Sequence, residues 1–207
     1  MLLCGDAQTR SRFQLMKIFK LCTDADASVV LRTNIPYFRT HFIGKPMAQS
    51  WRSPQITVLN KSKRVLDFTS WMLSAPAVSE RAKGVLGNCV GGQAEFLPLI
   101  RVKGVQIYAM NVLNTVDCLD IAKSQIVFDP SEPGRIVNVH RYALDLTKVA
   151  TDPVVFKVPD DLGQVFVSQT LVDVIVANNL SGSLLANPLA NPFSTILPNS
   201  PDVLKPV

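Results

Sequence analysis

The sequence predicts an α+β fold, with a mainly antiparallel sheet and two principal helices. Short apolar runs separated by turn-forming residues recur along the chain, as in strands joined by hairpins. Only two stretches place apolar residues at the spacing of an amphipathic helix. One run near the middle, Gln106–Leu113, carries Asn111 as its only strongly polar residue after Gln106. Such a run, rich in Ile, Tyr and Val, is typical of a strand covered on both faces, so we expect the fold to be organised around it.

The expected strands are apolar runs bounded by polar, Gly or Pro residues. They are Met16–Cys22, Val29–Arg32, Gln55–Leu59, Arg64–Phe68, Ala94–Val102, Gln106–Leu113, Gln125–Phe128, Arg135–Tyr142, Val154–Val158 and Gln164–Ser168. The segment Thr33–Pro54 is expected to be mostly loop, because Pro36, Pro46 and Pro54 interrupt it.

Turn signals predict how several of these strands pair. A turn at Asn60–Lys63 is expected to join the two strands that flank it. Lys103–Gly104 and Pro133–Gly134 each lie between two apolar runs, and so predict two antiparallel hairpins. Pro98 has no backbone N–H to donate, which places its strand at a sheet edge or at a bulge.

Two segments predict helices. The first begins near Ser74 or Ser79, has Pro76 in its first turn and ends at Gly87. Its apolar face would consist of Ala77, Val78, Ala82, Val85 and Leu86. Ser168 would cap the second helix. The apolar face and the end of that helix would be formed by Leu171, Val172, Ile175, Val176 and Asn178–Asn179.

The composition is that of a folded protein. The 207 residues are 47% hydrophobic and 18% charged, which is enough apolar surface for a substantial core. No apolar run approaches the roughly 18 residues that cross a bilayer, and charge interrupts the N-terminus before a signal peptide develops. We therefore expect a cytosolic protein. Its widely scattered cysteines (Cys4, Cys22, Cys89 and Cys118) would then be small buried apolar side chains.

One domain is expected, at residues 16–185. Residues 1–15 lack periodicity and are interpreted as an extension outside the fold, so that Met16 is an alternative start to Met1. Residues 186–207 contain several prolines without periodicity and are interpreted as a tail.

The charge of the chain is uneven. The formal net charge is +5, and the segment Ala27–Leu66 contains no Asp or Glu. Its cations are Arg32, Arg39, Lys45, Arg52, Lys61, Lys63 and Arg64, interleaved with Tyr37, Phe38, His41, Phe42 and Trp51. Basic residues among aromatic ones indicate a nucleic-acid surface. The same pattern also fits a solvated face over core aromatics, or a docking surface for an acidic protein.

No catalytic constellation stands out. Cys118 beside Asp117 is a possible nucleophile, but neither His41 nor His140 lies in a recognisable motif. Asp117, Asp120 and Asp129 are possible ligands of a hard cation, but they lack the spacing of a calcium loop. We interpret the aspartates as turn and cap residues, and expect Asn111 to be satisfied by neighbouring backbone. The residues therefore predict no cofactor, no metal and no active site.

The segment Met110–Asp120, with the sequence Met-Asn-Val-Leu-Asn-Thr-Val-Asp-Cys-Leu-Asp, resembles the signature of a bacterial immunity protein family. This is the eleventh numbered family of immunity proteins from polymorphic toxin systems, formerly a domain of unknown function. The resemblance runs from about Met16 to Leu185. Shorter matching segments are Met16–Leu21, Gly44–Pro46 with Trp51, Asp67–Phe68, Ser79–Ala82, Glu95–Pro98, Phe166–Ser168 and Leu180–Gly182.

The resemblance implies a cytoplasmic protein, not an enzyme, that binds a cognate toxin and protects its producer during competition between bacteria. It implies no cofactor and no catalytic residue. The signature side chains would then be structural: Asn111, Asn114, Asp117, Cys118 and Asp120. Binding residues are generally found on exposed loops, so the toxin interface is expected at Arg39, Lys45, Arg52, Lys61, Lys63 and Arg64. The alternatives are a nucleic-acid-binding module that uses residues 27–66, and an enzyme built on Cys118 or the aspartates.

Overall fold

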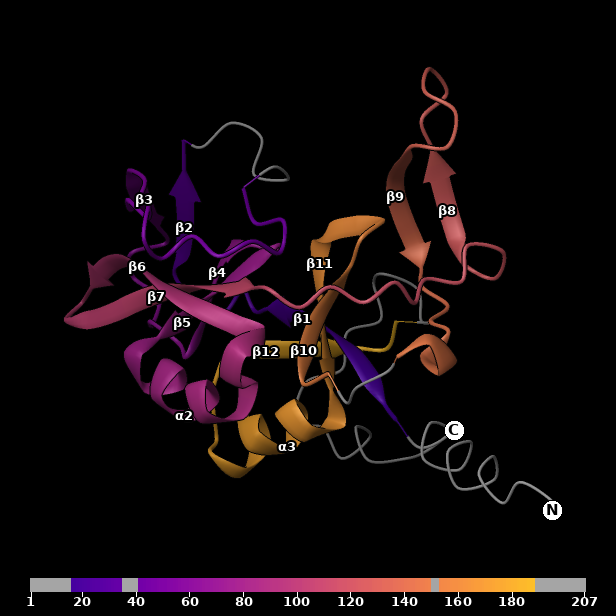
Figure 1. The fold of residues 1–207 in the computed structure, drawn as a ribbon. Helices are drawn as coiled ribbons and strands as arrows, with labels where there is room; N and C mark the ends of the chain where they lie inside the picture. The colour runs from indigo at the N-terminus through magenta and orange to yellow at the C-terminus, as the bar shows by residue number, and fades with distance from the viewer. Residues whose placement is uncertain (1–15, 35–40, 150–152, 189–207) are drawn as a thin grey trace, which may run out of the picture.

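The computed structural model describes residues 16–34, 41–149 and 153–188, and its elements are labelled in Figure 1. The strands are β1 (Ile18–Thr23), β2 (Val30–Thr33), β3 (Ile56–Leu59), β4 (Phe68–Met72), β5 (Ala75–Ser79), β6 (Ala94–Val102), β7 (Val105–Val112), β8 (Gln125–Phe128), β9 (Ile136–Arg141), β10 (Val155–Val158), β11 (Asp161–Ser168) and β12 (Ser183–Ala186). The helices are α2 (Glu80–Val90) and α3 (Gln169–Ala177), with short 3-10 turns at Gly91–Gln93 and Leu146–Lys148.

The strands form two larger sheets and a separate hairpin. One sheet has four antiparallel strands in the order β10-β11-β1-β12. The other has six strands in the order β3-β2-β4-β5-β7-β6, and only its β2–β4 pair is parallel. The remaining two strands, β8 and β9, pair only with each other among the described residues. The predicted α+β fold class, with a mainly antiparallel sheet and two principal helices, is confirmed.

Strand β7 has the central position that the sequence predicts. It lies between β5 and β6, and its side chains alternate between two apolar clusters. Ile107 and Ala109 pack into one cluster, Met110 and Val112 pack into the other, and all four are fully buried. The expectation of a strand covered on both faces is therefore confirmed.

The core has three parts. The central part lies between the two sheets and is completed by α2 and α3, which lie side by side (Figure 1). The second part lies inside the curve of the six-stranded sheet, whose edge strands β3 and β6 approach each other. The third part involves β9, β10 and β11, and it contains the buried Cys118.

The first helix is shorter at its start and longer at its end than predicted. Ser79 is the N-cap, and its Oγ accepts a hydrogen bond from the Ala82 N–H at 3.1 Å. The preceding residues, including Pro76, form β5, so Ala77 and Val78 are not on the helix. The helix continues past Gly87 to Val90, because Gly91 is the residue with a positive φ of 50°.

Strand β5 was missed because a short apolar run fits a buried strand as well as a helix. All five of its residues are buried between β4 and β7. Pro76 falls at a register shift in the β4–β5 ladder, where a missing N–H is tolerated. The predicted strand Arg64–Phe68 is also wrong: β3 pairs with β2 instead, and Arg64 makes only an isolated bridge to Ser28.

The hairpins are confirmed. β6 and β7 pair across Lys103 and Gly104, β6 is an edge strand, and the register shifts between Pro98 and Ile100. β8 and β9 form the second hairpin across the loop that contains Gly134.

The C-terminal elements differ in three details from the prediction. Ser168 is the N-cap residue of α3, but its side chain forms no hydrogen bond to the helix. Helix α3 buries Leu171, Val172 and Ile175, but Val176 is 46% exposed and is not part of the apolar face. Strand β12 was not predicted at all. Ala186 belongs to it, is buried and pairs with Lys20, so the described sheet extends past residue 185. Residues 1–15 and 189–207 lie outside the described part of the chain.

Candidate functional site

The side chains at the end of β7 hold distant segments together. Asn111 is fully buried, and its Nδ2 donates to Glu95 Oε1 at 2.7 Å and to the Lys45 carbonyl at 2.9 Å. Its Oδ1 has no partner within the described residues. We expected neighbouring backbone to satisfy Asn111, and this is confirmed only for its amide nitrogen. That nitrogen also donates to the Glu95 carboxylate.

Glu95 fixes the segment before β3 onto the edge of the six-stranded sheet. Its carboxylate accepts from the Met47 N–H at 2.6 Å and from the Ala48 N–H at 3.2 Å. The Trp51 indole N–H donates to the Pro98 carbonyl at 2.8 Å. These contacts join two segments of the predicted resemblance, Gly44–Pro46 with Trp51 and Glu95–Pro98.

Asn114 joins the two sheets. Its carbonyl accepts from the Lys157 N–H at 3.0 Å, and its Nδ2 donates to the Val155 carbonyl and to Gln93 Oε1, each at 3.3 Å. Gln93 Oε1 also accepts from the Val154 N–H at 2.9 Å. Because Val155 and Lys157 lie in β10, these bonds attach the end of β7 to the four-stranded sheet.

Lys157 is a buried cation next to this junction. Its side chain is fully buried, and Nζ donates to the Phe42 carbonyl at 2.5 Å. Burial lowers the pKa of the Lys157 ammonium to about 8, against a smaller opposite effect of the Asp161 carboxylate. This amine therefore holds the segment around Phe42 against β10 at the cost of a buried charge.

The aspartates after β7 stabilise separate turns. Asp120 accepts from the Lys123 N–H at 3.1 Å, and the hydrogen bond from the Lys123 ammonium lowers the pKa of Asp120. Asp129 accepts from the Ser131 hydroxyl at 2.6 Å, which lowers the pKa of Asp129. Asp117 is exposed. In the described ranges, no three His, Cys, Asp or Glu side chains come close enough to hold a metal ion.

Cys118 lacks the properties of a nucleophile. Its side chain is fully buried, and burial, followed by the charges of Asp117 and Asp145, raises the pKa of the Cys118 thiol to about 11. Neither histidine forms a hydrogen bond to this thiol among the described contacts. A catalytic cysteine needs a lowered pKa, so Cys118 is a small apolar core residue, as expected.

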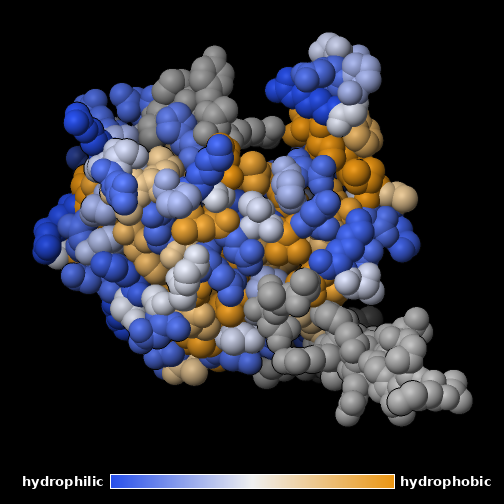
Figure 2. All heavy atoms as spheres, in the orientation of Figure 1, coloured by the Kyte–Doolittle hydropathy of each residue, from blue (hydrophilic) through white to orange (hydrophobic). Residues whose placement is uncertain are grey.

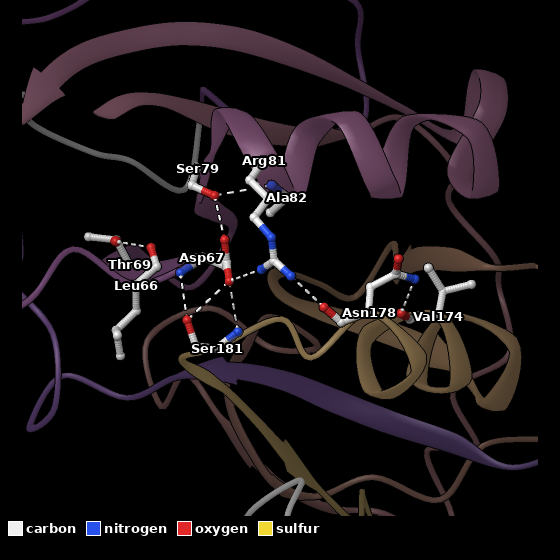
Figure 3. A network of polar contacts seen from close by, with 9 residues as sticks. All are labelled: Leu66, Asp67, Thr69, Ser79, Arg81, Ala82, Val174, Asn178 and Ser181. Atoms are coloured by element: carbon white, nitrogen blue, oxygen red, sulfur yellow. Dashed lines mark hydrogen bonds and ion pairs between the residues drawn. The ribbon is translucent and has the colours of Figure 1, made fainter. Parts of the chain in front are cut away.

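A second polar network links β4, α2 and the turn before β12 (Figure 3). Asp67 Oδ1 accepts from the Ser79 hydroxyl at 2.8 Å, and Asp67 Oδ2 accepts from Arg81 Nη1 at 2.6 Å. The same Oδ2 accepts from the Ser181 N–H at 3.0 Å and from the Ser181 hydroxyl at 3.1 Å. Arg81 Nη2 reaches the Asn178 carbonyl at the end of α3, at 2.5 Å.

Gly182 lets the turn at Ser181 approach β4 this closely. Its φ is +87°, and a Cβ atom there would lie 2.8 Å from Leu66 Cβ and would collide with the Phe68 carbonyl. Three segments of the resemblance therefore meet at the Asp67 carboxylate: Asp67–Phe68, Ser79–Ala82 and Leu180–Gly182.

Comparison with known protein families identifies the family to which these segments belong. The family model of the Imm11 immunity proteins matches residues 14–186. The chain belongs to the Imm11 immunity protein family. A search of curated protein sequences found no match. The predicted resemblance is thus confirmed, and the Imm11 match covers the described strands and both helices.

In this Imm11 chain, most of the signature residues at the end of β7 are buried or contact other parts of the chain. Asn111 and Asn114 bond other segments of the chain, Cys118 fills the core, and Asp120 closes a turn. Exposed Asp117 has no hydrogen bond or ion pair among the described residues. Four of the five signature residues are therefore buried or bonded to other parts of the chain, and Asp117 is the exposed one.

The structure places the predicted interface residues in two groups. Arg39 lies outside the described residues. Lys45 and Arg52 are exposed beside β6, where Glu95 and Pro98 hold their segment. Lys61 and Arg64 are exposed and Lys63 is half-buried, and all three lie in the turn after β3. The predicted segment therefore does not form one continuous cluster.

Another exposed surface is apolar. The hairpin β8–β9 projects from the body of the molecule, and Figure 2 shows hydrophobic side chains along it below a hydrophilic tip. Val127, Phe128 and Val137 are 41%, 46% and 40% exposed, and Ile121 just before the hairpin is 51% exposed. Exposed apolar patches of this kind often mark interaction surfaces. No helix in the described ranges is long and apolar enough to cross a membrane.

Several of these residues give no recognisable signal in the sequence. Glu95, Asp67 and Arg81 were noted only as parts of the resemblance, and their shared contacts depend on how the sheets pack. Lys157 lies in an apolar run, where a lone lysine gives no signal that its amine is buried. The one signal in the sequence was that these residues lie in the short segments that carry the family resemblance. Polar residues in separate matching segments suggest that those segments meet in the fold.

Proposed function

We propose that this Imm11 protein binds a cognate toxin in the cytoplasm of the producing cell and neutralises it stoichiometrically. The family match over residues 14–186 carries the proposal. The contacts of the signature residues support it, because they hold the fold together and leave the exposed surface for a partner. On this account the protein protects a producer and its kin in a polymorphic toxin system.

Binding explains the described side chains better than turnover does. The Cys118 thiol has a pKa of about 11 and is buried, so thiolate is scarce near neutral pH. Asp120 and Asp129 each close a local turn and point to no shared ligand. A stable complex requires neither a nucleophile nor a cofactor.

We place the toxin interface on the basic residues that the sequence predicts, which are Arg39, Lys45, Arg52, Lys61, Lys63 and Arg64. The aromatic residues nearby favour a protein partner over single-stranded nucleic acid. Phe42 is only 1% exposed and packs against Trp51 and Trp71, with ring centroids 6.0 and 5.6 Å apart. Phe42 therefore presents no free face on which a base could stack.

Co-expression tests the proposal. Where the gene immediately upstream encodes a toxin, the C-terminal domain of that toxin is expressed from an inducible promoter in a susceptible strain. Growth is expected to recover only when the Imm11 protein reaches the molar amount of the toxin, and the two proteins should co-purify. Rescue by trace amounts of the Imm11 protein would contradict stoichiometric binding, and failure to rescue at any level would contradict the function.

A further inference from the structure

Two turns that are far apart in the sequence lie side by side at one end of the six-stranded sheet. The first follows β3 and contains Lys61, Lys63 and Arg64. The second joins β6 to β7 and contains Lys103. Lys103 Nζ donates to the Lys63 carbonyl at 2.7 Å, which fixes the two turns to each other. We call the surface formed by Lys61, Lys63, Arg64, Arg101 and Lys103 the cationic double turn.

The cations of the double turn lack acidic partners. Lys61, Arg64, Arg101 and Lys103 are exposed, and none of the five residues forms an ion pair in the described ranges. Their recorded contacts are to backbone carbonyls: Lys63 Nζ donates to Asp26 and Arg101 Nη1 donates to Gly104 at 3.0 Å. Asp26 brings one exposed carboxylate near by, so the surface keeps a clear positive excess.

The backbone holds these cations in fixed positions. Lys103 and Gly104 have φ values of 49° and 83°, as in a tight two-residue turn between the paired strands β6 and β7. Asn60, at the start of the turn after β3, also has a positive φ, of 51°. The Lys63 N–H donates to the Asn60 carbonyl at 2.9 Å, and the Val29 N–H donates to the Arg64 carbonyl at 3.0 Å. A surface whose charges are already in place loses less entropy when a partner binds.

We propose that the cationic double turn is the docking surface for an acidic patch on the toxin. This inference rests on the proposed function and narrows its interface: Arg101 and Lys103, from outside the basic segment, join Lys61, Lys63 and Arg64. Lys45 and Arg52, held beside β6 by the Glu95 and Pro98 contacts, stand outside this surface. Charge complementarity of this kind accelerates association more than it strengthens the bound complex.

The test compares two triple charge reversals. The first combines Lys61→Glu, Arg64→Glu and Lys103→Glu. The control combines Lys17→Glu, Lys123→Glu and Lys148→Glu, which changes the net charge equally at exposed lysines on other elements. Association with the toxin domain encoded upstream is measured by stopped flow at about 50 and 500 mM salt, since salt screens exposed charges. Circular dichroism and thermal melting establish that each variant is folded.

The double-turn variant is expected to associate about 10-fold or more slowly than the wild type at low salt, and within about 3-fold of it at high salt. The control variant should stay within about 3-fold at both salt concentrations. Equal loss in both variants would mean that only net charge matters and would overturn the inference. A loss in the control alone would also overturn it, and would move the interface towards the β8–β9 side.

Two further measurements separate the remaining outcomes. If the double-turn variant does not fold, it is replaced by Lys61→Glu alone and by the salt dependence of wild-type association. A wild-type association rate that does not change with salt overturns the inference. Binding of a 20-nucleotide single strand that the double-turn variant loses, with unchanged toxin association, would assign the surface to nucleic acid instead. A wild-type protein that does not bind the toxin at all would contradict the proposed function itself.

Discussion

The carboxylate of Asp67 lies 2.6 Å from the guanidinium of Arg81, and this ion pair connects the start of β4 with the first turn of α2. The Asp67 side chain is only 11% exposed, whereas that of Arg81 is 54% exposed. The buried carboxylate also accepts from Ser79 and Ser181, so it orients three segments at once. Asp67 is therefore the more important member of the pair for stability.

Asp67→Ala is expected to lower the free energy of unfolding by about 2 to 3 kcal/mol. The substitution leaves the Ser181 N–H and the Ser79 hydroxyl without their acceptor in a buried site. Arg81→Ala should cost about 1 kcal/mol or less, because an exposed cation is largely screened by solvent. Urea unfolding of both variants measures the difference. An Asp67→Ala protein with wild-type stability that no longer binds the toxin would give Asp67 a direct functional role.

Cys118→Ala is expected to cost on the order of 1 kcal/mol through lost packing, and the folded variant should still protect against the toxin. The raised pKa of the Cys118 thiol also predicts slow alkylation by iodoacetamide at pH 8 in the native protein, with Cys22 and Cys89, which are partly exposed, reacting first. Mass spectrometry of the modified peptides gives the order. Loss of protection in a folded Cys118→Ala variant would restore the nucleophile hypothesis.

The lowered pKa of Lys157 predicts that the free energy of unfolding rises with pH. Its pKa is about 8 in the folded protein and 10.5 in the reference state, so the unfolded chain binds more protons between these values. Stability is therefore gained as the pH rises from about 8 towards 10.5, and is lost as the pH falls through 8. Between pH 8 and 9 the expected gain is about 1 kcal/mol. Cys118 acts oppositely between pH 9 and about 11, so the lower window is the informative one.

Lys157→Met is the matched variant for this prediction. It removes the titrating amine while keeping a long apolar side chain, so the gain between pH 8 and 9 should disappear. At pH 7 its stability should be close to that of the wild type, because relief of a buried charge offsets the lost bond to the Phe42 carbonyl. Urea unfolding across the pH range measures both. The same pH slope in Lys157→Met would assign the titration to another group.

Two truncations test the C-terminal boundary of the proposed domain. A chain that ends after Pro188 keeps Ala186 in β12 and the hydrogen bond from the Tyr142 N–H to the Pro188 carbonyl, at 3.0 Å. A chain that ends after Leu185 loses both. The shorter chain should melt several degrees lower, the shift expected for about 1 to 2 kcal/mol in a domain of this size. Equal melting temperatures would show that Ala186 and Pro188 contribute nothing to the fold.

Local sequence patterns predicted much of this fold, but few of its hydrogen bonds and ion pairs. β6 was predicted with its boundaries, and the Lys103–Gly104 turn was identified because its two-residue signal is local. β5 was missed because Ala75–Ser79 is short and apolar, so burial on both faces and helical periodicity look alike. β12 was missed because its only described sheet neighbour is β1, more than 150 residues earlier in the chain.

In the candidate site too, local features were predicted from the sequence and contacts between distant segments were not. Exposed cations on a loop are visible in the sequence, which is why Lys61, Lys63 and Arg64 were identified. The addition of Lys103 depends on the curl of the six-stranded sheet, which brings β3 near β6, and no local pattern encodes that approach. The apolar hairpin was predicted as strands, but the exposure of Phe128 depends on how the other described elements pack, since none of them covers that residue.

The most direct test of neutralisation by binding is a titration of the purified toxin domain with the purified Imm11 protein, followed by native mass spectrometry. We predict that complex forms in proportion to added Imm11 protein until a fixed integer ratio is reached. After the complex is dissociated, the toxin should have its original mass and its original toxicity. Inactivation of excess toxin by a small amount of Imm11 protein, or a changed toxin mass, would contradict the account.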